Sequence, residues 1–200
     1  MRYGPEHKSS TRTRILAAAE SLFRKQGFQG ASVERVMRAA GLTVGGFYAH
    51  FASKESLLVE SLRGFLQRNG AAWVAGLEEL RGQAFLSHFV RRYLNRQRRD
   101  DPQTKCMMPS LLSDLTRATP QVQATLAEGL DALAREIQAH LEGEPDETAR
   151  QKALATIALC FGAMTLARAT ASQPFSDELL QAARSVVPTH GEEPSPPPPR

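Results

Sequence analysis

The chain has 200 residues, of which 42% are apolar and 23% are charged. These values are ordinary for globular proteins and exclude a wholly disordered chain. No apolar run approaches the roughly 18–20 residues that span a bilayer, and the N-terminus lacks the apolar stretch of a signal peptide. Two cysteines are too few for a disulfide scaffold or a zinc cluster. We therefore expect a soluble, cytoplasmic protein that needs no metal and no other cofactor.

Positive charge is concentrated near the N-terminus. Residues 1–60 carry nine Lys or Arg and five Asp or Glu, so this segment accounts for the whole formal net charge of +4. Residues 61–200 carry 16 charges of each sign and sum to zero. A local positive excess indicates a polyanionic partner, with phosphate groups first, and carries no information about the fold.

Helical periodicity runs through the chain, and the alternation typical of strands is nearly absent. Apolar residues recur at spacings of three and four, and Ser, Thr, Gly and Pro residues mark the expected helix ends. The predicted helices cover residues 10–27, 32–41, 43–51, 53–66, 83–98, 111–115, 120–143, 146–172 and 176–187. The predicted fold class is therefore all-α.

Two of these helices form a motif. The helix that ends at Gly41 is followed, after a break at Gly41–Leu42, by a short helix that begins at Thr43. This is the layout of a helix-turn-helix. The second helix of such a motif enters the major groove of DNA, where base edges can be read.

The second helix of this motif contains two adjacent glycines, Gly45 and Gly46. Each costs a helix about 1 kcal/mol relative to alanine, so a segment selected only for stability would avoid them. Their missing side chains do allow a backbone to approach another surface closely, as insertion into a groove requires. The alternative is a glycine loop over residues 43–46, with the helix beginning at Phe47.

Several residues of the motif offer groups that suit DNA. The set expected to contact it is Ser32, Thr43, Val44, Gly45, Phe47, Tyr48, His50 and Lys54. The apolar members and the glycine are expected to meet bases, and the remainder to donate to phosphates. The Thr43 hydroxyl suits either a helix amide or a phosphate. Alternatives are core packing for Tyr48 and a solvated side chain for His50 and for Lys54.

The basic residues that precede the motif have two interpretations. Lys8, Arg12 and Arg14 belong either to an arm that reaches along the duplex or into the minor groove, or to a solvated segment. Phosphate contacts of this kind would make the affinity for DNA fall steeply with salt.

The segment from Gly41 to Leu58, Gly-Leu-Thr-Val-Gly-Gly-Phe-Tyr-Ala-His-Phe-Ala-Ser-Lys-Glu-Ser-Leu-Leu, resembles the DNA-binding signature of tetracycline-repressor-like (TetR) regulators. The resemblance covers about residues 8–62, and the aromatic–Tyr–x–x–Phe–x–x–Lys–Glu spacing is its most specific part. Gly46 departs from the family pattern, in which many relatives have a larger or hydroxylated residue, and this bears on which bases are read. The resemblance implies that Tyr48 contacts a phosphate.

The resemblance also implies a homodimer that binds palindromic double-stranded DNA and a small-molecule inducer. Helices 146–172 and 176–187 would form the dimerising pair, with internal packing as the alternative. An inducer would lie among the middle helices, and the residues expected to line its cavity are Trp73, Phe85, His88, Phe89, Tyr93, Met107, Met108 and His140. Plain core packing is the alternative for each of them.

Two features of the second half have open interpretations. Cys106 follows Lys105 in a polar loop between Pro102 and Pro109, where a nearby cation would lower the pKa of the thiol. It is therefore a candidate redox sensor, with an ordinary thiol as the alternative. A basic cluster is either a solvated helix face, a site for an anionic inducer or a helix end close to DNA; it consists of Arg91, Arg92, Arg96, Arg98 and Arg99.

The sequence thus predicts a ligand-responsive transcriptional regulator, a repressor that an inducer releases from its operator, and not an enzyme. The alternatives are an activator with the same fold and a small-molecule-binding protein without operator binding. The predicted domains are a flexible basic arm (1–9), a helix-turn-helix domain (10–52), a ligand-binding and dimerisation domain (53–187) and a disordered Pro-rich tail (188–200). A proline-rich ligand motif is the alternative for the tail.

Overall fold

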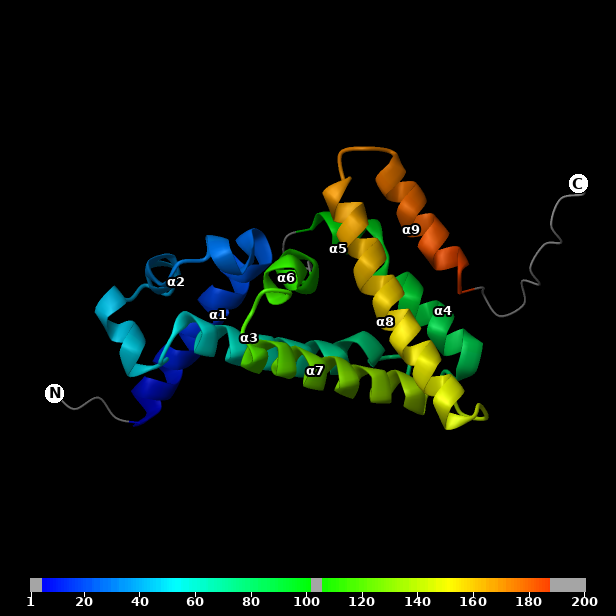
Figure 1. Ribbon diagram of the computed structural model, residues 1–200, viewed down its shortest axis with the longest axis horizontal. Coiled ribbons are helices and arrows are strands. Elements are labelled where there is room, and N and C mark those ends of the chain that lie inside the picture. Colours follow the sequence, from blue (N-terminus) through cyan, green and yellow to red (C-terminus); the bar gives the residue numbers. More distant parts are fainter. Residues whose placement is uncertain (1–4, 102–105, 188–200) are drawn as a thin grey trace, which may run out of the picture. The chain divides into compact units, whose positions relative to one another are not determined.

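The protein is described by a computed structural model, which defines residues 5–101 and 106–187. Within these ranges the chain forms helices and no strand, so the predicted all-α class is confirmed (Figure 1). The helices are α1 (Pro5–Gly30), α2 (Val33–Ala39), the 3₁₀-helix η1 (Val44–Ala49), α3 (Lys54–Val74), α4 (Gly82–Tyr93), α5 (Arg96–Asp100), α6 (Met108–Leu115), α7 (Pro120–Ala139), α8 (Asp146–Ala169) and α9 (Phe175–Ser185). The predicted tail, 188–200, lies outside the described residues.

The chain divides into two compact units. The first comprises residues 1–68 and 106–130, and the second comprises residues 69–105 and 131–200. The predicted domain boundary near residue 53 differs from this division because α6 packs closely against α1. The helix-turn-helix is therefore part of a larger unit than the sequence indicated.

Helix α1 begins earlier and ends later than predicted. It starts at Pro5, so residues 5–9 are helical where the sequence predicted a flexible arm. Proline suits the start of a helix because its missing N–H has no partner to lose there. At Gly27 the backbone has φ 69° and ψ −177°, a conformation that favours glycine, and α1 kinks before ending at Gly30.

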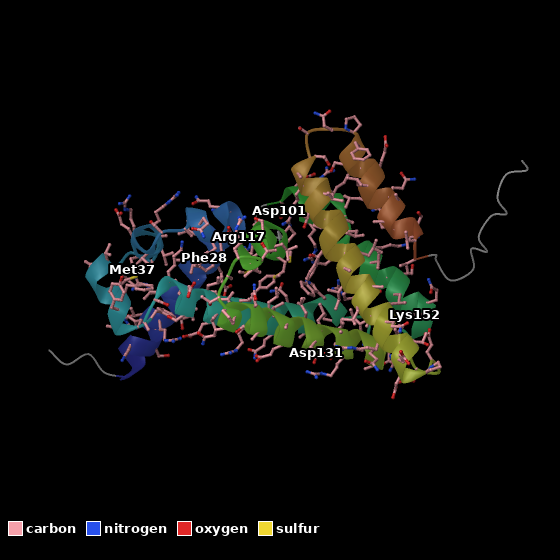
Figure 2. The ribbon with its side chains drawn as sticks, in the orientation of Figure 1. Phe28, Met37, Asp101, Arg117, Asp131 and Lys152 are labelled. Atoms are coloured by element: carbon pink, nitrogen blue, oxygen red, sulfur yellow. The ribbon has the colours of Figure 1, made fainter. Side chains whose placement is uncertain are left out.

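Helix α6 packs on α1 close to the kink at Gly27, beside Phe28, which is labelled in Figure 2. The Phe28 amide donates a hydrogen bond to Asp114 Oδ2 at 2.7 Å, and Ser110 Oγ donates to the Arg24 carbonyl oxygen at 2.9 Å. A Cβ at position 27 would lie 2.9 Å from Asp114 Oδ2 and 3.0 Å from the Ser110 carbonyl oxygen. The glycine therefore permits both the turn and the close approach of α6.

Large apolar side chains from four elements form the core of the first unit. Phe23 of α1, Met37 of α2, Phe47 of η1 and Leu57 of α3 are each at most 1% exposed. Helix α2 and η1 contribute to the same core as α1 and α3. Burial of apolar surface in this core therefore holds the helix-turn-helix in place.

In the second unit, α8 packs against α9 and against α4 (Figure 1). Arg99 links α5 to this pair, and its side chain is only 9% exposed. It donates to Ser176 Oγ at 2.7 Å and to Asp177 Oδ1 at 2.8 Å, while Ser176 Oγ donates to the Ala167 carbonyl oxygen at 2.7 Å. One buried guanidinium thus joins α5, α8 and α9.

The arginine cluster is mostly engaged within the second unit. Arg96 and Arg99 both pair with Asp177, at 2.7 Å and 2.8 Å. Arg92 donates to the Ala75 carbonyl oxygen. These contacts replace the purely solvated face predicted for the cluster, because neighbouring helices supply acceptors that the local pattern does not show.

Contrary to the expectation from sequence, α8 is long and apolar enough to cross a membrane by length and composition alone, with a mean hydropathy of 1.3 over 18 residues. Its buried residues include Ile157, Phe161 and Met164, and the helix packs on α4, α5 and α9. Packing of this kind is typical of a core helix in a globular protein, which passes the same test.

Candidate nucleic-acid interface

Helix α2 and η1 form the predicted helix-turn-helix. Ser32 caps α2, with its Oγ accepting the Arg35 amide at 3.2 Å. The turn is closed by the Leu42 amide, which donates to the Met37 carbonyl oxygen at 2.9 Å. Gly41 has φ 66°, a value that favours glycine. The cap and the turn glycine therefore act locally as the sequence predicted.

Basic residues of α1 support this turn. Arg14 Nη2 donates to the Ala40 carbonyl oxygen at 2.7 Å, at the end of α2. Arg12 forms an ion pair with Glu60 of α3. Lys8, the third basic residue considered for an arm, is exposed. Arg14 thus ties α1 to the end of α2, and Arg12 ties α1 to α3.

The second helix of the motif, η1, is a 3₁₀-helix, which is wound more tightly than the α-helix that the sequence predicted. Both glycines lie within it, so the alternative of a glycine loop is wrong. A Cβ on Gly46 would lie 3.7 Å from Met37 Cε, whereas a Cβ on Gly45 would meet nothing within 4 Å. Gly46 therefore faces α2 and Gly45 faces open space. Thr43 precedes the helix and makes no side-chain cap, which leaves its hydroxyl outside the helix end.

Two adjacent aromatic side chains of η1 differ completely in exposure. Phe47 is 0% exposed and stacks on Phe51, with ring centres 5.7 Å apart. Tyr48 is 70% exposed, and Val44 is 44% exposed. The prediction that Phe47 meets bases is wrong, because its ring is core, and core packing of Tyr48 is equally wrong. His50, which follows η1, is half-buried.

Lys54 begins α3, but its ammonium lies over the Phe28 ring, 4.1 Å from the ring centre. Burial lowers the pKa of Lys54, and the charge of Asp114 opposes that shift. The start of α3 is capped by serines, since the Ser56 amide donates to Ser53 Oγ and the Ser53 amide to Ser56 Oγ, both at 3.0 Å. The predicted phosphate contact of Lys54 stays a prediction.

The residues predicted to line an inducer cavity fall in both units. Met107 and Met108 belong to the first unit and are 0% exposed. The other six belong to the second unit. His88 is exposed, with Nδ1 2.9 Å from the Ala84 carbonyl oxygen, so it does not line an interior cavity as predicted. Phe85 and Phe89 take the buried face of α4, which leaves His88 on the outer face.

The remaining predicted lining residues take part in aromatic contacts of the second unit. The rings of Phe85 and His140 are stacked, with centres 4.0 Å apart and planes 2° from parallel. Trp73 meets Tyr93 edge to face at 5.5 Å and Phe161 at 5.9 Å. Such contacts stabilise a core. That these residues line an inducer cavity stays a prediction.

Both cysteines are free thiols and buried. Cys106 is 2% exposed, so it does not occupy the exposed polar position that the candidate sensor required. Burial raises the pKa of Cys160 to about 12, against the opposing charge of Arg98. Among the described residues, no group of three His, Cys, Asp or Glu side chains is arranged to hold a metal ion.

Residues 15–60 match the family described as bacterial regulatory proteins, tetR family. This range contains α2, the turn and η1, with the buried Phe47 and the exposed Tyr48. Residues 15–60 thus carry the DNA-binding segment of the TetR family. This is a family of DNA-binding regulators and not of enzymes.

Two transcriptional regulators are similar in sequence to part of this chain. The HTH-type transcriptional repressor KstR2 of Rhodococcus jostii (strain RHA1) is 46% identical over 59 residues, which are 30% of this chain and 29% of KstR2. The HTH-type transcriptional regulator UidR of Escherichia coli (strain K12) is 35% identical over 80 residues, 40% of this chain and 39% of UidR. The matched segments therefore span less than half of these relatives.

Solved structures agree over nearly the whole chain. The reduced form of NemR from E. coli has a TM-score of 0.74 at 20% identity, over 92% of this chain and 100% of NemR. A TetR transcriptional regulator from Legionella pneumophila has a TM-score of 0.71 at 21% identity, over 94% of this chain and 100% of its own. At these identities the likeness concerns the fold.

Three residues that position the helix-turn-helix were not predicted from the sequence. The Phe28 ring contacts the Lys54 ammonium, and Glu60 forms an ion pair with Arg12. Asp114 accepts a hydrogen bond from the Phe28 amide. Each acts on a partner that is distant in sequence, and no local pattern marks such pairs.

Proposed function

We propose that this chain is a transcriptional repressor that binds a palindromic operator as a homodimer in the cytoplasm and leaves the operator when a small molecule binds. The observation that carries the proposal is the exposure of Tyr48 on a helix anchored by the buried Phe47. A ring so exposed adds little to the fold, while its hydroxyl suits a phosphate. The positive excess in residues 1–60 favours the same partner.

The outer side of η1 supports base reading. The Val44 side chain is exposed and suits the methyl group of thymine. Gly45 faces open space, so the backbone there can approach base edges closely. Thr43, His50 and Lys54 flank these two residues with groups that donate to phosphates, and Ser32 stands at the start of α2. Together they form the proposed contact surface.

The dimer is proposed to form through α8 and α9. Each helix exposes a large apolar side chain, since Leu166 of α8 is 56% exposed and Phe175 of α9 is 54% exposed. The exposed positions of α8 also include Ala158 and Gly162, whose small size permits close approach of a second helix. A two-fold dimer presents two recognition elements to the two halves of a palindrome.

We propose that inducer binding is coupled to the helix-turn-helix through α6 and α3. Helix α6 is tied to α1 by the Asp114 and Ser110 hydrogen bonds, and α1 is tied to the turn by Arg14. An inducer that favours a conformer with α6 displaced would therefore move the recognition element. This is a population shift between two arrangements of one packed unit.

Repression is favoured over activation because KstR2, with the matching helix-turn-helix segment, is a repressor. The test is selection of genomic fragments by the full-length protein, followed by a compound screen for release of the recovered DNA. We expect one palindromic sequence to be enriched and at least one compound to release it. Failure to enrich any sequence would favour a small-molecule-binding protein without an operator.

A further inference from the structure

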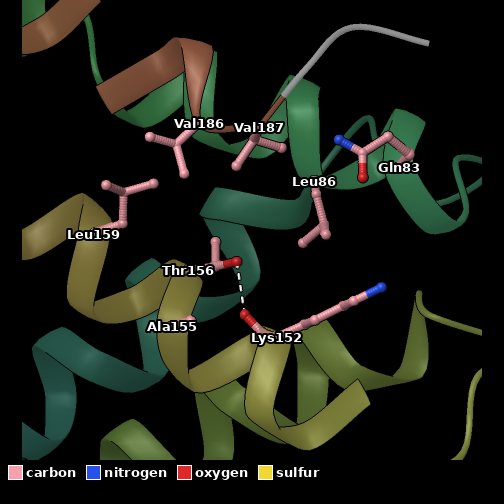
Figure 3. A pocket seen from close by; sticks show the side chains of 8 residues that line it. All are labelled: Gln83, Leu86, Lys152, Ala155, Thr156, Leu159, Val186 and Val187. Atoms are coloured by element: carbon pink, nitrogen blue, oxygen red, sulfur yellow. Dashed lines mark hydrogen bonds between the residues drawn. The ribbon is translucent and has the colours of Figure 1, made fainter. Parts of the chain in front are cut away.

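The second unit contains a cavity of about 400 Å³ between α4, α8 and the end of α9 (Figure 3). This volume is within the range of roughly 300–1,000 Å³ that takes small-molecule ligands. Leu86 and Thr156 are only 6% and 5% exposed, whereas Gln83, Lys152, Ala155 and Val186 are exposed, so the cavity is open to solvent. None of the residues predicted for an inducer cavity lines it.

The lining of this cavity is polar at one end and apolar at the other. Figure 3 shows the Lys152 ammonium and the Gln83 amide toward one end, and Leu159 and Val186 toward the opposite end. Thr156 Oγ1 donates to the Lys152 carbonyl oxygen at 2.8 Å, so its hydroxyl proton is used within α8. The charged donor that the cavity offers to a ligand is therefore the Lys152 ammonium.

Lys152 is held at the cavity by an acidic neighbour. Its Nζ donates to Glu144 Oε1 at 2.6 Å, and its side chain is 48% exposed. An ammonium has three donor protons, so one hydrogen bond to Glu144 leaves two for another acceptor. The cavity thus combines an apolar body with a positioned cation whose charge is partly offset.

We propose that this cavity binds a small amphipathic carboxylate, with its apolar chain against Leu86, Leu159 and Val186 and its anionic head on Lys152. An apolar chain gains free energy by leaving water, and a carboxylate gains a charge-assisted hydrogen bond at the one end that has a cation. A carboxylate fits better than an uncharged ligand of the same shape. The proposal stands apart from operator binding, because no residue of the helix-turn-helix takes part.

The test is calorimetric titration of the full-length protein with octanoate and with octanamide, which has the same chain and no charge. We expect octanoate to bind at least about tenfold more tightly. Lys152→Met should reduce octanoate affinity to that of octanamide and leave octanamide unchanged. Lys25→Met, an equal loss of charge in the other unit, should alter neither, and Glu144→Gln should tighten octanoate binding several-fold by removing the competing acid.

Filling the cavity provides a second arm. Ala155 lines it and is exposed, so Ala155→Trp should block both probes without lowering the melting temperature. Equal affinity for the two probes, no binding of either, or octanoate binding unchanged by Lys152→Met would overturn the proposal. So would octanoate binding only after removal of residues 188–200, which would make the chain's own tail the occupant. Loss of octanoate binding on dimer formation would make a second copy the occupant.

Discussion

The Lys54 ammonium lies 4.1 Å from the centre of the Phe28 ring, so the first residue of α3 is packed on the last turn of α1. The same Phe28 donates its amide to Asp114 of α6, and the charge of Asp114 opposes the fall in the pKa of Lys54 caused by burial. Three elements of the first unit therefore meet at one aromatic residue. Lys54, which we propose contacts a phosphate, and α6, through which we propose the inducer acts, therefore both contact Phe28.

The Lys54–Phe28 contact should be measurable as a coupling energy. In a double-mutant cycle with Lys54→Met and Phe28→Leu, we expect a coupling of about 0.5–1 kcal/mol in the free energy of unfolding, since a cation over a ring at a partly exposed site contributes that much. Urea denaturation of the four proteins gives the value. Lys8→Met in place of Lys54→Met should show no coupling with Phe28→Leu, since Lys8 is exposed and far from Phe28 in α1.

Tyr48 should matter for DNA and not for folding. Tyr48→Ala should change the free energy of unfolding by less than about 0.5 kcal/mol, because the side chain is 70% exposed. Phe47→Ala, one residue away and fully buried, should cost about 3–5 kcal/mol. Chemical denaturation separates the two. A similar cost for both variants would mean that Tyr48 is part of the core.

Gly27 should tolerate no side chain. Gly27→Ala combines a strained backbone with a Cβ 2.9 Å from Asp114 Oδ2, and we expect a loss of about 2 kcal/mol or more in the free energy of unfolding. Gly76 has a similar φ of 79° with nothing within 4 Å of its Cβ position, so Gly76→Ala reports the backbone strain alone. The difference between the variants in thermal or urea denaturation measures the close approach of α6. Equal losses would refute the tight α1–α6 junction.

Arg99 should be the arginine of the cluster on which the second unit depends. Arg99→Met deprives the buried Ser176 hydroxyl and Asp177 of a donor, and should lower the free energy of unfolding by about 1–3 kcal/mol. Arg96→Met is the matched control: its side chain is 72% exposed, and its loss should cost less than about 1 kcal/mol. Chemical denaturation at neutral pH is the measurement. A larger loss of stability for Arg96→Met than for Arg99→Met would contradict the role of Arg99 in joining α5, α8 and α9.

The stability of the protein at low pH should test the ion pairs of Asp177 with Arg96 and Arg99. Hydrogen bonds from Arg96 and then from Arg99 lower the pKa of Asp177 below its ordinary value of 3.8. Because the folded state favours the ionised carboxylate, its contribution is present above that pH and is lost as the pH falls through the lowered pKa. Lowering the pH from about 5 to about 2 should therefore reduce the free energy of unfolding less in Arg99→Met than in the parent protein. Urea denaturation at each pH measures this loss.

Thiol labelling should find both cysteines unreactive. Cys106 is 2% exposed, and burial raises the pKa of Cys160 to about 12, so little thiolate exists at pH 8. With Ellman's reagent we expect no rapid labelling of the native protein and two thiols after unfolding. Rapid labelling of one native thiol that disappears in Cys106→Ser would instead support the redox-sensor hypothesis.

Much of the helix-turn-helix could be predicted because its determinants are local. Ser32 caps the next turn and Gly41 takes a positive φ, and both are visible in a few neighbouring residues. Helical periodicity likewise predicted the all-α class. The 3₁₀ geometry of η1 was missed because its apolar residues are too few to distinguish a tight helix from an α-helix.

What the sequence could not predict depends on distant partners. Phe47 and Tyr48 are adjacent aromatics, and only the position of Phe51 and α2 decides which of them is buried. The role of Gly27 depends on α6, more than 80 residues later in the chain. The cavity lined by Lys152 is likewise made by three helices brought together by folding.

We expect η1 to read duplex DNA through its exposed face. The most direct measurement is selection of genomic fragments by the parent protein and by a Tyr48→Ala, Lys54→Ala double variant, with circular dichroism to show that both are folded. The proposed surface predicts that the parent enriches one palindromic sequence and that the folded double variant does not. Equal enrichment by the double variant would contradict the assignment of these contacts.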